Sequence, residues 1–309
     1  MPAQHIAPIN RILVTTGLTL ESLGAVHLAR SLAQTLGAEL HAVHVIVPAS
    51  KAETRAMPDL AARIEQQARE ELERYALTHD LRGFATLHIA LGQPGAEIIR
   101  LATSLKADLV VIGRYGKGGP KPGTIGSVAD RVVRRCPVSV LVVQPEFQGP
   151  IARIGVASTC EEDSAIELER AMDLAARLDL DRIDLIKAYD IPAGYHLVSS
   201  YEDATTRLAE VHTELAIAQI TAARELLKST VAVAVESRLG PPVDTLAQFA
   251  HDAALDLLII RTHNRTGPAE LFLDRISERV INNAACNIWA EKSPAESQSL
   301  LDVFRHLLD

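Results

Sequence analysis

The sequence is poor in aromatic residues, in cysteine and in long apolar runs. Aromatic side chains make up only 4% of its 309 residues. The core must therefore be built from Ala, Val, Ile and Leu, as in helices layered on a buried parallel sheet. Three cysteines are too few for a disulfide framework. No run reaches the roughly 18 apolar residues of a membrane helix, and no signal-peptide pattern opens the chain. We therefore expect a cytoplasmic protein.

A strongly basic face is also missing. The net charge is −8, with 16 Lys and Arg against 13 Asp and Glu (+3) in residues 1–150 and 15 against 26 (−11) in residues 151–309. Nucleic-acid binding needs a basic face, so we expect neither a nucleic-acid nor a membrane partner. Only the first half would attract a small anion. The uneven charge is explained equally well by surface residues that drifted apart between the two halves without functional meaning.

The sequence does contain an internal repeat. RILVTT at 11–16 corresponds to RIGVAS at 153–158, and LGQP at 91–94 corresponds to LGPP at 239–242. Strand and helix patterns alternate in each half, which predicts parallel strands joined by right-handed crossovers. The fold class is therefore α/β, with two tandem doubly wound five-stranded parallel-sheet domains at 1–147 and 151–309. Ligands of such domains lie beyond the carboxyl ends of the strands, where the strand order switches.

One motif indicates chemistry. The apolar strand 110–112 leads into GRYGKGGPKPGTIGSVADRVVRR, in which Gly113, Gly116, Gly126 and Ser127 are spaced G-x2-G-x9-G-S. Glycine lets the backbone approach an anion closely, and the N–H groups at a helix N-terminus favour phosphate. Ser127 would either cap the helix or bond a phosphate. A plain surface loop capped by Ser127 is the alternative. Three nearby cations add positive charge: Arg114, Lys117 and Lys121.

This spacing resembles the nucleotide loop of the universal stress protein family. The segments ILVTTGLTLES, LGQPGAEIIRLATSLKADLVVIG and CPVSVLVV resemble further parts of that family, and the second half resembles it in pattern. The chain thus resembles a tandem universal stress protein, of the adenine nucleotide alpha hydrolase-like fold. The resemblance implies a stress-response protein that binds ATP or another adenine nucleotide, with or without Mg²⁺, in its first domain.

The resemblance also implies site residues. Phosphates and ribose would be held by Gly113, Gly116, Gly126, Ser127 and Val128, adenine by the backbone of Val45 between His44 and Ile46, and Thr16 and Gly17 would lie beside the ribose.

Gly17 departs from the family pattern, which has an aspartate at that position. Thr16 or Thr19 can donate one hydrogen bond there, but neither holds a divalent cation as a carboxylate does. Binding is then weaker, less metal-dependent or directed to another nucleotide. Because no general base is evident, we expect at most slow ATP hydrolysis rather than an evolved enzyme.

The second half lacks the glycine motif. At the matching positions stand Arg261, Asn264, Asp274, Arg275 and Thr159. Cβ atoms and a helix-leading aspartate oppose phosphate binding, so we predict a structural or partner-binding copy. An alternative is an acidic ligand on a basic cluster formed by Arg261, His263, Arg265 and Arg275. Against it stands the pairing of Arg275 with Asp274 or Glu278 on an exposed helix face.

A rival hypothesis for the whole chain is an interaction scaffold without a nucleotide. The last strands, Val138–Val143 and Ile288–Ala290, would pair as an intrachain pseudo-dimer, or the chain would form a homodimer. His41 and His44 lie on opposite faces of the second strand, and we interpret them as a surface and a half-buried side chain rather than metal ligands. Cys136 and Cys286 are interpreted as small apolar residues.

Overall fold

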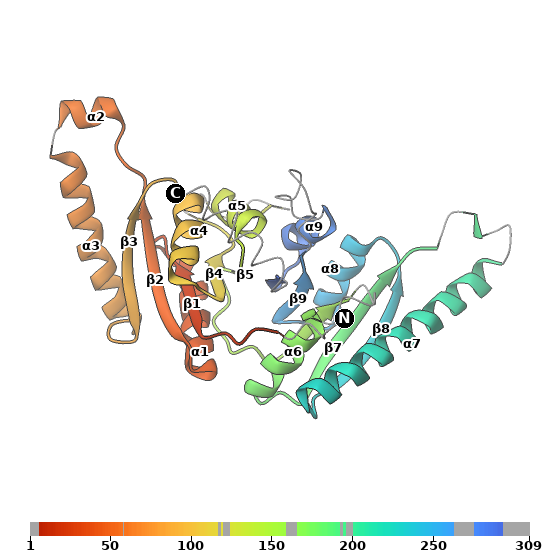
Figure 1. Ribbon diagram of the computed structural model, residues 1–309. Helices are drawn as coiled ribbons and strands as arrows, with labels where there is room; N and C mark the ends of the chain where they lie inside the picture. Colours follow the sequence, from red (N-terminus) through yellow and green to blue (C-terminus); the bar gives the residue numbers. More distant parts are fainter. Residues whose placement is uncertain are drawn as a thin grey trace. The chain divides into compact units, whose positions relative to one another are not determined.

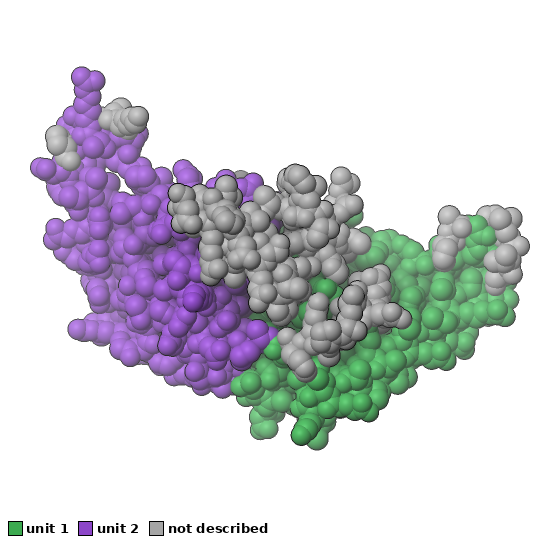
Figure 2. All heavy atoms as spheres, in the orientation of Figure 1, with its two compact units in different colours: residues 1–6, 151–294 green, residues 7–150, 295–309 purple. Residues whose placement is uncertain are grey.

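The structure is a computed structural model that describes residues 6–57, 59–116, 119, 124–158, 166–191, 194–195, 200–262 and 275–292, with the backbone alone for 51, 52, 275 and 276. The chain divides after residue 150 into two compact units (Figure 2). Residues 7–150 belong to the first unit and residues 151–292 to the second.

The first unit is a five-stranded parallel sheet covered by helices (Figure 1). Its strands are β1 (Arg11–Thr15), β2 (Glu39–Ile46), β3 (Ala85–Leu91), β4 (Leu109–Gly113) and β5 (Ser139–Val143), in the order β3-β2-β1-β4-β5. Its helices are the 3-10 turn η1 (Leu20–Ser22), α1 (Leu23–Leu36), α2 (Lys51–Ala56), α3 (Leu60–Thr78), α4 (Pro94–Leu105) and α5 (Ser127–Arg135). Right-handed crossovers place α1 and α3 on one face of the sheet and α4 and α5 on the other.

The second unit repeats this topology in its described part. Its strands are β6 (Ile154–Ala157), β7 (Arg182–Tyr189), β8 (Ala232–Leu239), β9 (Leu257–Arg261) and β10 (Asn287–Glu291), all parallel in the order β8-β7-β6-β9-β10. Its helices are α6 (Ile166–Arg177), α7 (Tyr201–Leu227), α8 (Pro242–Asp252) and α9 (Arg275–Asn283). Figure 1 shows α7 along β8, as α3 lies along β3 in the first unit. The predicted doubly wound α/β fold is confirmed.

The sequence explains the central elements of both units. Every residue of β4 is buried, as expected for a strand covered on both faces. Gly92 and Gly240 take φ of 150° and 142°, which a side chain would strain. The prolines that follow begin α4 and α8, where their fixed φ suits the first helical turn.

The repeat extends to individual hydrogen bonds. Oδ2 of Asp108 accepts the backbone N–H groups of the two residues that lead into β1, at 2.8 and 2.9 Å. Oδ2 of Asp256 does the same for the two residues before β6, at the same distances. Thr16 N–H donates to Val43 O at 2.9 Å, and Ser158 N–H donates to Ile186 O at 3.1 Å. The carboxyl ends of the strands are thus built alike in both units.

Three smaller points follow from burial and helix length. Cys136 and Cys286 are both buried, as expected of small apolar residues. No helix in the described ranges is long and apolar enough to cross a membrane. His41 is not a surface side chain, because only 12% of it is exposed; it and His44 are both half-buried.

Candidate functional site

The strand order of the first unit switches between β1 and β4. The crossover helices leave these neighbours toward opposite faces, which opens a crevice at their carboxyl ends. Thr16 and Gly17 follow β1, and Gly113 ends β4. The structure therefore brings three of the predicted site residues to the place where this fold binds ligands.

The three loop glycines differ in their surroundings. A Cβ on Gly113 would lie 3.1 Å from the Glu21 carbonyl oxygen, and one on Gly126 would lie 3.3 Å from the Arg114 carbonyl oxygen. Close packing within the chain therefore favours glycine at both positions. Gly116 is exposed, and a Cβ there would meet no atom within 4 Å among the residues that the structure describes. The fold does not explain a glycine at 116, whereas a ligand lying against the backbone does.

The N-terminus of α5 faces this loop. Gly126 is the N-cap, and its N–H donates to Arg114 O at 2.8 Å. Ser127 is the first helical residue and is exposed, so its interpretation as the N-cap is wrong. A glycine N-cap has no side chain to accept the first N–H groups of the helix, including that of Val128. These N–H groups and the helix dipole suit an anion.

The opposite wall of the crevice is the end of β2. The carbonyl of Val43 accepts from Thr16 on the β1 side, and the carbonyl of Ile46 accepts from Gly92 on the β3 side. Because backbone groups alternate along a strand, those of Val45 point toward β1, beyond the last β1–β2 pair. A flat heterocycle can bond to this backbone, as the family resemblance implies for adenine.

Thr16 is engaged within its own turn. Its hydroxyl accepts the N–H of Leu18 at 3.0 Å and lies 3.1 Å from the Ser22 hydroxyl, with 5% of the residue exposed. At Gly17, an added Cβ would meet Thr19 Oγ1 at an ordinary 3.5 Å. A carboxylate is therefore sterically possible at 17. Among the residues that the structure describes, no group of three or more His, Cys, Asp or Glu is arranged to hold a metal.

Of the three cations expected beside the loop, the structure describes only Arg114. Arg114 is 3% exposed, and its Nε donates to the Tyr115 hydroxyl at 3.1 Å. Its guanidinium lies 5.7 Å from the centroid of the same ring. Arg114 is thus packed against Tyr115 rather than displayed on the loop. Lys117 and Lys121 lie outside the described residues.

The family model described as the universal stress protein family matches residues 8–144 and again 150–290. The chain belongs to this family. A universal stress protein of Methanocaldococcus jannaschii is 29% identical over 143 residues, covering 43% of this chain and 81% of the relative. One of Thermus aquaticus is 34% identical over 122 residues, covering 39% and 88%. The tandem arrangement expected from the repeat is confirmed.

Two solved structures share the fold over nearly the whole chain. A universal stress protein of Archaeoglobus fulgidus has a TM-score of 0.69 at 18% identity, covering 93% of this chain and 100% of that one. A protein of Pseudomonas aeruginosa described as functionally unknown has a TM-score of 0.66 at 19% identity, covering 96% and 98%.

In the second universal stress protein unit, described side chains contact one another at the matching strand ends. Arg261 ends β9 where Gly113 ends β4. Ser158, the counterpart of Thr16, lies 3.4 Å from Glu167 Oε1 and 3.3 Å from the side-chain oxygen of Gln219. Glu167 is 1% exposed. Burial raises the pKa of its carboxyl to about 7, although the charge of Arg261 acts in the opposite direction.

A buried ion pair adjoins this crevice. Arg170 Nε lies 3.1 Å from Glu291 Oε1, and both side chains are at most 4% exposed. Trp289 Nε1 donates to the other oxygen of the same carboxylate at 2.5 Å. Burial raises the pKa of the Glu167 carboxyl and the charge of Arg261 lowers it, so this arginine lies within electrostatic reach of an internal acid as well as of the alternative basic cluster. The other residues of that prediction lie outside the description: Thr159, His263, Asn264, Arg265, Asp274 and the side chain of Arg275.

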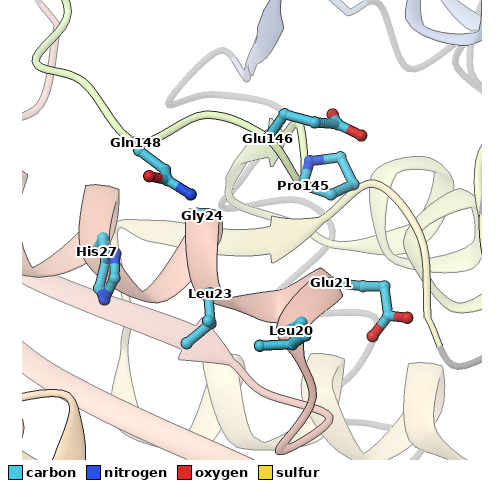
Figure 3. A pocket seen from close by; sticks show the side chains of 8 residues that line it. All are labelled: Leu20, Glu21, Leu23, Gly24, His27, Pro145, Glu146 and Gln148. Carbon is cyan, nitrogen blue, oxygen red and sulfur yellow. The ribbon is translucent and has the colours of Figure 1, made fainter.

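A pocket that the sequence did not indicate lies elsewhere in the first unit (Figure 3). Its walls are the start of α1 and the segment after β5: Leu20, Glu21, Leu23, Gly24, His27, Pro145, Glu146 and Gln148. A hydrogen bond with Thr19 lowers the pKa of the Glu21 carboxyl and favours its ionised form. Two carboxylates on an apolar wall do not suit a phosphate, so this pocket is not the nucleotide site.

Proposed function

We propose that the first unit binds an adenine nucleotide, with ATP as the first candidate. The observation that carries this proposal is Gly116, an exposed glycine beside the N-terminus of α5 with open space where a side chain would stand. Its φ lies outside the left-handed region, so backbone conformation does not require glycine either. Close approach of a phosphate to the backbone does require glycine at this position.

The proposed contacts follow the geometry of the crevice. The phosphates lie on the loop and the first turn of α5, at Gly113, Gly116, Gly126, Ser127 and Val128. The backbone of Val45 bonds the adenine ring, and the turn at Thr16 and Gly17 lies beside the ribose. Because position 17 has no carboxylate, Mg²⁺ contributes little to the affinity. A site without a general base senses a nucleotide rather than turning it over, and hydrolysis is at most slow.

The cellular role in this proposal is a stress response in the cytoplasm, with the chain acting as a homodimer or as an intrachain pseudo-dimer. The second unit does not bind a nucleotide in the same manner and serves structure or partner binding.

A scaffold without any nucleotide is the second candidate. Two observations favour it: Gly113 and Gly126 each have a packing reason for being glycine, and described side chains contact one another at the matching strand ends of the second unit. The two candidates differ over Gly116, for which the described residues give no packing reason.

The decisive experiment is ATP titration of Gly116→Asp. The added Cβ meets no atom within 4 Å in the described part of the chain, so we expect the fold to be kept, but the carboxylate stands where phosphate oxygens approach. Like charges at contact cost several kcal/mol, so we expect affinity to fall about 100-fold or more. Gly149→Asp is the matched control, because it adds the same charge at another glycine with open surroundings.

Wild-type affinity in Gly116→Asp, with the melting temperature unchanged, would remove the site from this loop. Absence of binding by the wild-type protein to ATP, ADP and AMP would favour the scaffold.

A further inference from the structure

Two histidines of the first unit meet across neighbouring strands. His41 lies on β2 and His88 on β3, and His41 Nδ1 is 3.0 Å from His88 Nε2. The ring centroids are 5.2 Å apart with an interplanar angle of 32°. Val43 pairs with His88 in the parallel register, and His41 shares the face of Val43. Hydrogen-bonded strands therefore hold both rings in place.

The separation of the two nitrogens suits a metal ion. Zn²⁺ binds imidazole nitrogen at about 2.0–2.1 Å in tetrahedral geometry, which puts two such nitrogens about 3.3 Å apart. The observed 3.0 Å requires a shift of a few tenths of an ångström. A metal ion in place of the shared proton lies off the line between the two nitrogens, so both rings must also turn toward it.

The far side of His41 has a carboxylate of the kind that supports metal-bound histidine. His41 Nε2 is a buried nitrogen without a hydrogen-bond partner within the described part of the chain. It lies 3.8 Å from Glu39 Oε2, which Arg11 Nε holds at 2.9 Å. A carboxylate that accepts the second N–H of a ligating histidine fixes the ring and raises its basicity.

The two rings are also accessible. Both side chains keep partial exposure, so an ion can reach them.

The fold itself does not require this pair. The second unit has Asp184 and Glu236 at the corresponding strand positions. Each carboxylate there pairs with an arginine two residues away on its own strand. Two imidazoles facing each other are thus particular to the first unit.

We propose that His41 Nδ1 and His88 Nε2 bind a divalent transition-metal ion, with Zn²⁺ as the first candidate. Glu39 orients His41. Water completes the coordination, so the ion exchanges readily. The site lies on the sheet face covered by α4, because Arg11, which shares that face with Glu39, donates to the carbonyl of Leu105 at the end of α4. It is independent of the nucleotide crevice and of the function proposed above.

The test is Zn²⁺ titration by calorimetry without nucleotide. His41→Ala and His88→Ala should each lose one equivalent of bound Zn²⁺ that the wild type takes up. Glu39→Gln should keep the site with roughly tenfold or weaker affinity, as expected for loss of a carboxylate behind a ligating histidine. His251→Ala in the second unit is the control, since 76% of that side chain is exposed, and it should bind as the wild type does.

A second measurement needs no variant. Zn²⁺ added to the wild-type protein should shift the ring signals of His41 and His88 in NMR spectra before those of His251. Unmoved signals of this pair, or wild-type Zn²⁺ uptake by both alanine variants, would overturn the proposal.

Discussion

The two units share one backbone plan but differ in what stands in the crevice. Where β4 ends in Gly113, β9 ends in Arg261, and the buried Val143 at the end of β5 corresponds to Glu291 at the end of β10. In the helix that follows the first strand, Glu167 is buried in the second unit. Among the described residues, the first unit thus has glycine where the second has charged side chains, of which Glu291 pairs with Arg170.

This difference shows how a duplicated domain loses a ligand site without losing its fold. The strand-end hydrogen bonds of Thr16 and Ser158 are retained, because backbone pairing does not depend on these side chains. Arg261, which stands in place of the loop glycine, is half-buried. Glu167 lies close enough for the charge of Arg261 to affect its pKa.

The largest expected effect concerns Glu167 in the second unit. Its folded pKa of about 7 lies above the ordinary value of 4.5. Its contribution to stability is complete below pH 4.5 and is lost as the pH rises to 7. At about 1.4 kcal/mol per pKa unit, the loss is ~3 kcal/mol. Glu167→Gln should remove this loss. The free energy of unfolding of the variant should therefore rise relative to that of the wild type between pH 5 and pH 8.

The single tryptophan makes this measurement specific. Trp289 lies in β10, so urea unfolding followed by its fluorescence reports on the second unit. Glu225→Gln, at an exposed position of α7, is the control and should track the wild type at both pH values. An equal difference between Glu167→Gln and wild type at pH 5 and pH 8 would mean that Glu167 titrates normally.

A smaller effect is expected at Gly24 in the first unit. A Cβ there would lie 2.6 Å from the Gln144 carbonyl oxygen, because the segment after β5 crosses the start of α1. Ile166 stands at the matching place in the second unit. Alanine usually favours a helix, but overpacking against backbone costs about 1–3 kcal/mol.

Hydrogen exchange of the β1 and α1 amides in Gly24→Ala should accelerate accordingly, while the Trp289 unfolding midpoint stays unchanged. Unchanged exchange in α1 would show that the segment moves aside without cost.

The smallest expected effect is a gain in ATP affinity when Gly17 is substituted. The space beside Gly17 admits a side chain, so Gly17→Asp restores the carboxylate that the family resemblance implies near ribose and metal. We expect ATP affinity to rise about tenfold in Mg²⁺, equivalent to about 1.4 kcal/mol, and not to rise in EDTA. Affinity that is equal in Mg²⁺ and EDTA for this variant would contradict the proposed place of position 17 beside the bound nucleotide.

The fold was predictable because its signals are local and repeated. Apolar runs such as 109–112, the LGQP and LGPP turns and the spacing of the glycine motif all indicate elements that the structure contains. The helix cap was placed one residue late, since Gly126 and Ser127 are both good N-caps and spacing cannot separate them.

Other features depend on contacts between distant residues. On sequence grounds, we compared His41 only with His44 on its own strand. The contact between His41 and His88 depends on the register between β2 and β3. The first turn of α6 contains two glutamates, an ordinary exposed pattern at a helix start. Packing within the second unit buries Glu167 instead, which no local pattern indicates.

The most direct test of the contrast between the units is the amount of nucleotide that each chain holds. Mass spectrometry of the nucleotide released by denaturing the purified protein, with its molar ratio to chain, measures this quantity. The crevice geometry predicts one adenine nucleotide per chain, held in the first unit. Two per chain would contradict a second unit without a nucleotide site, and none, with no binding on titration with ATP, would contradict the proposed site in the first unit.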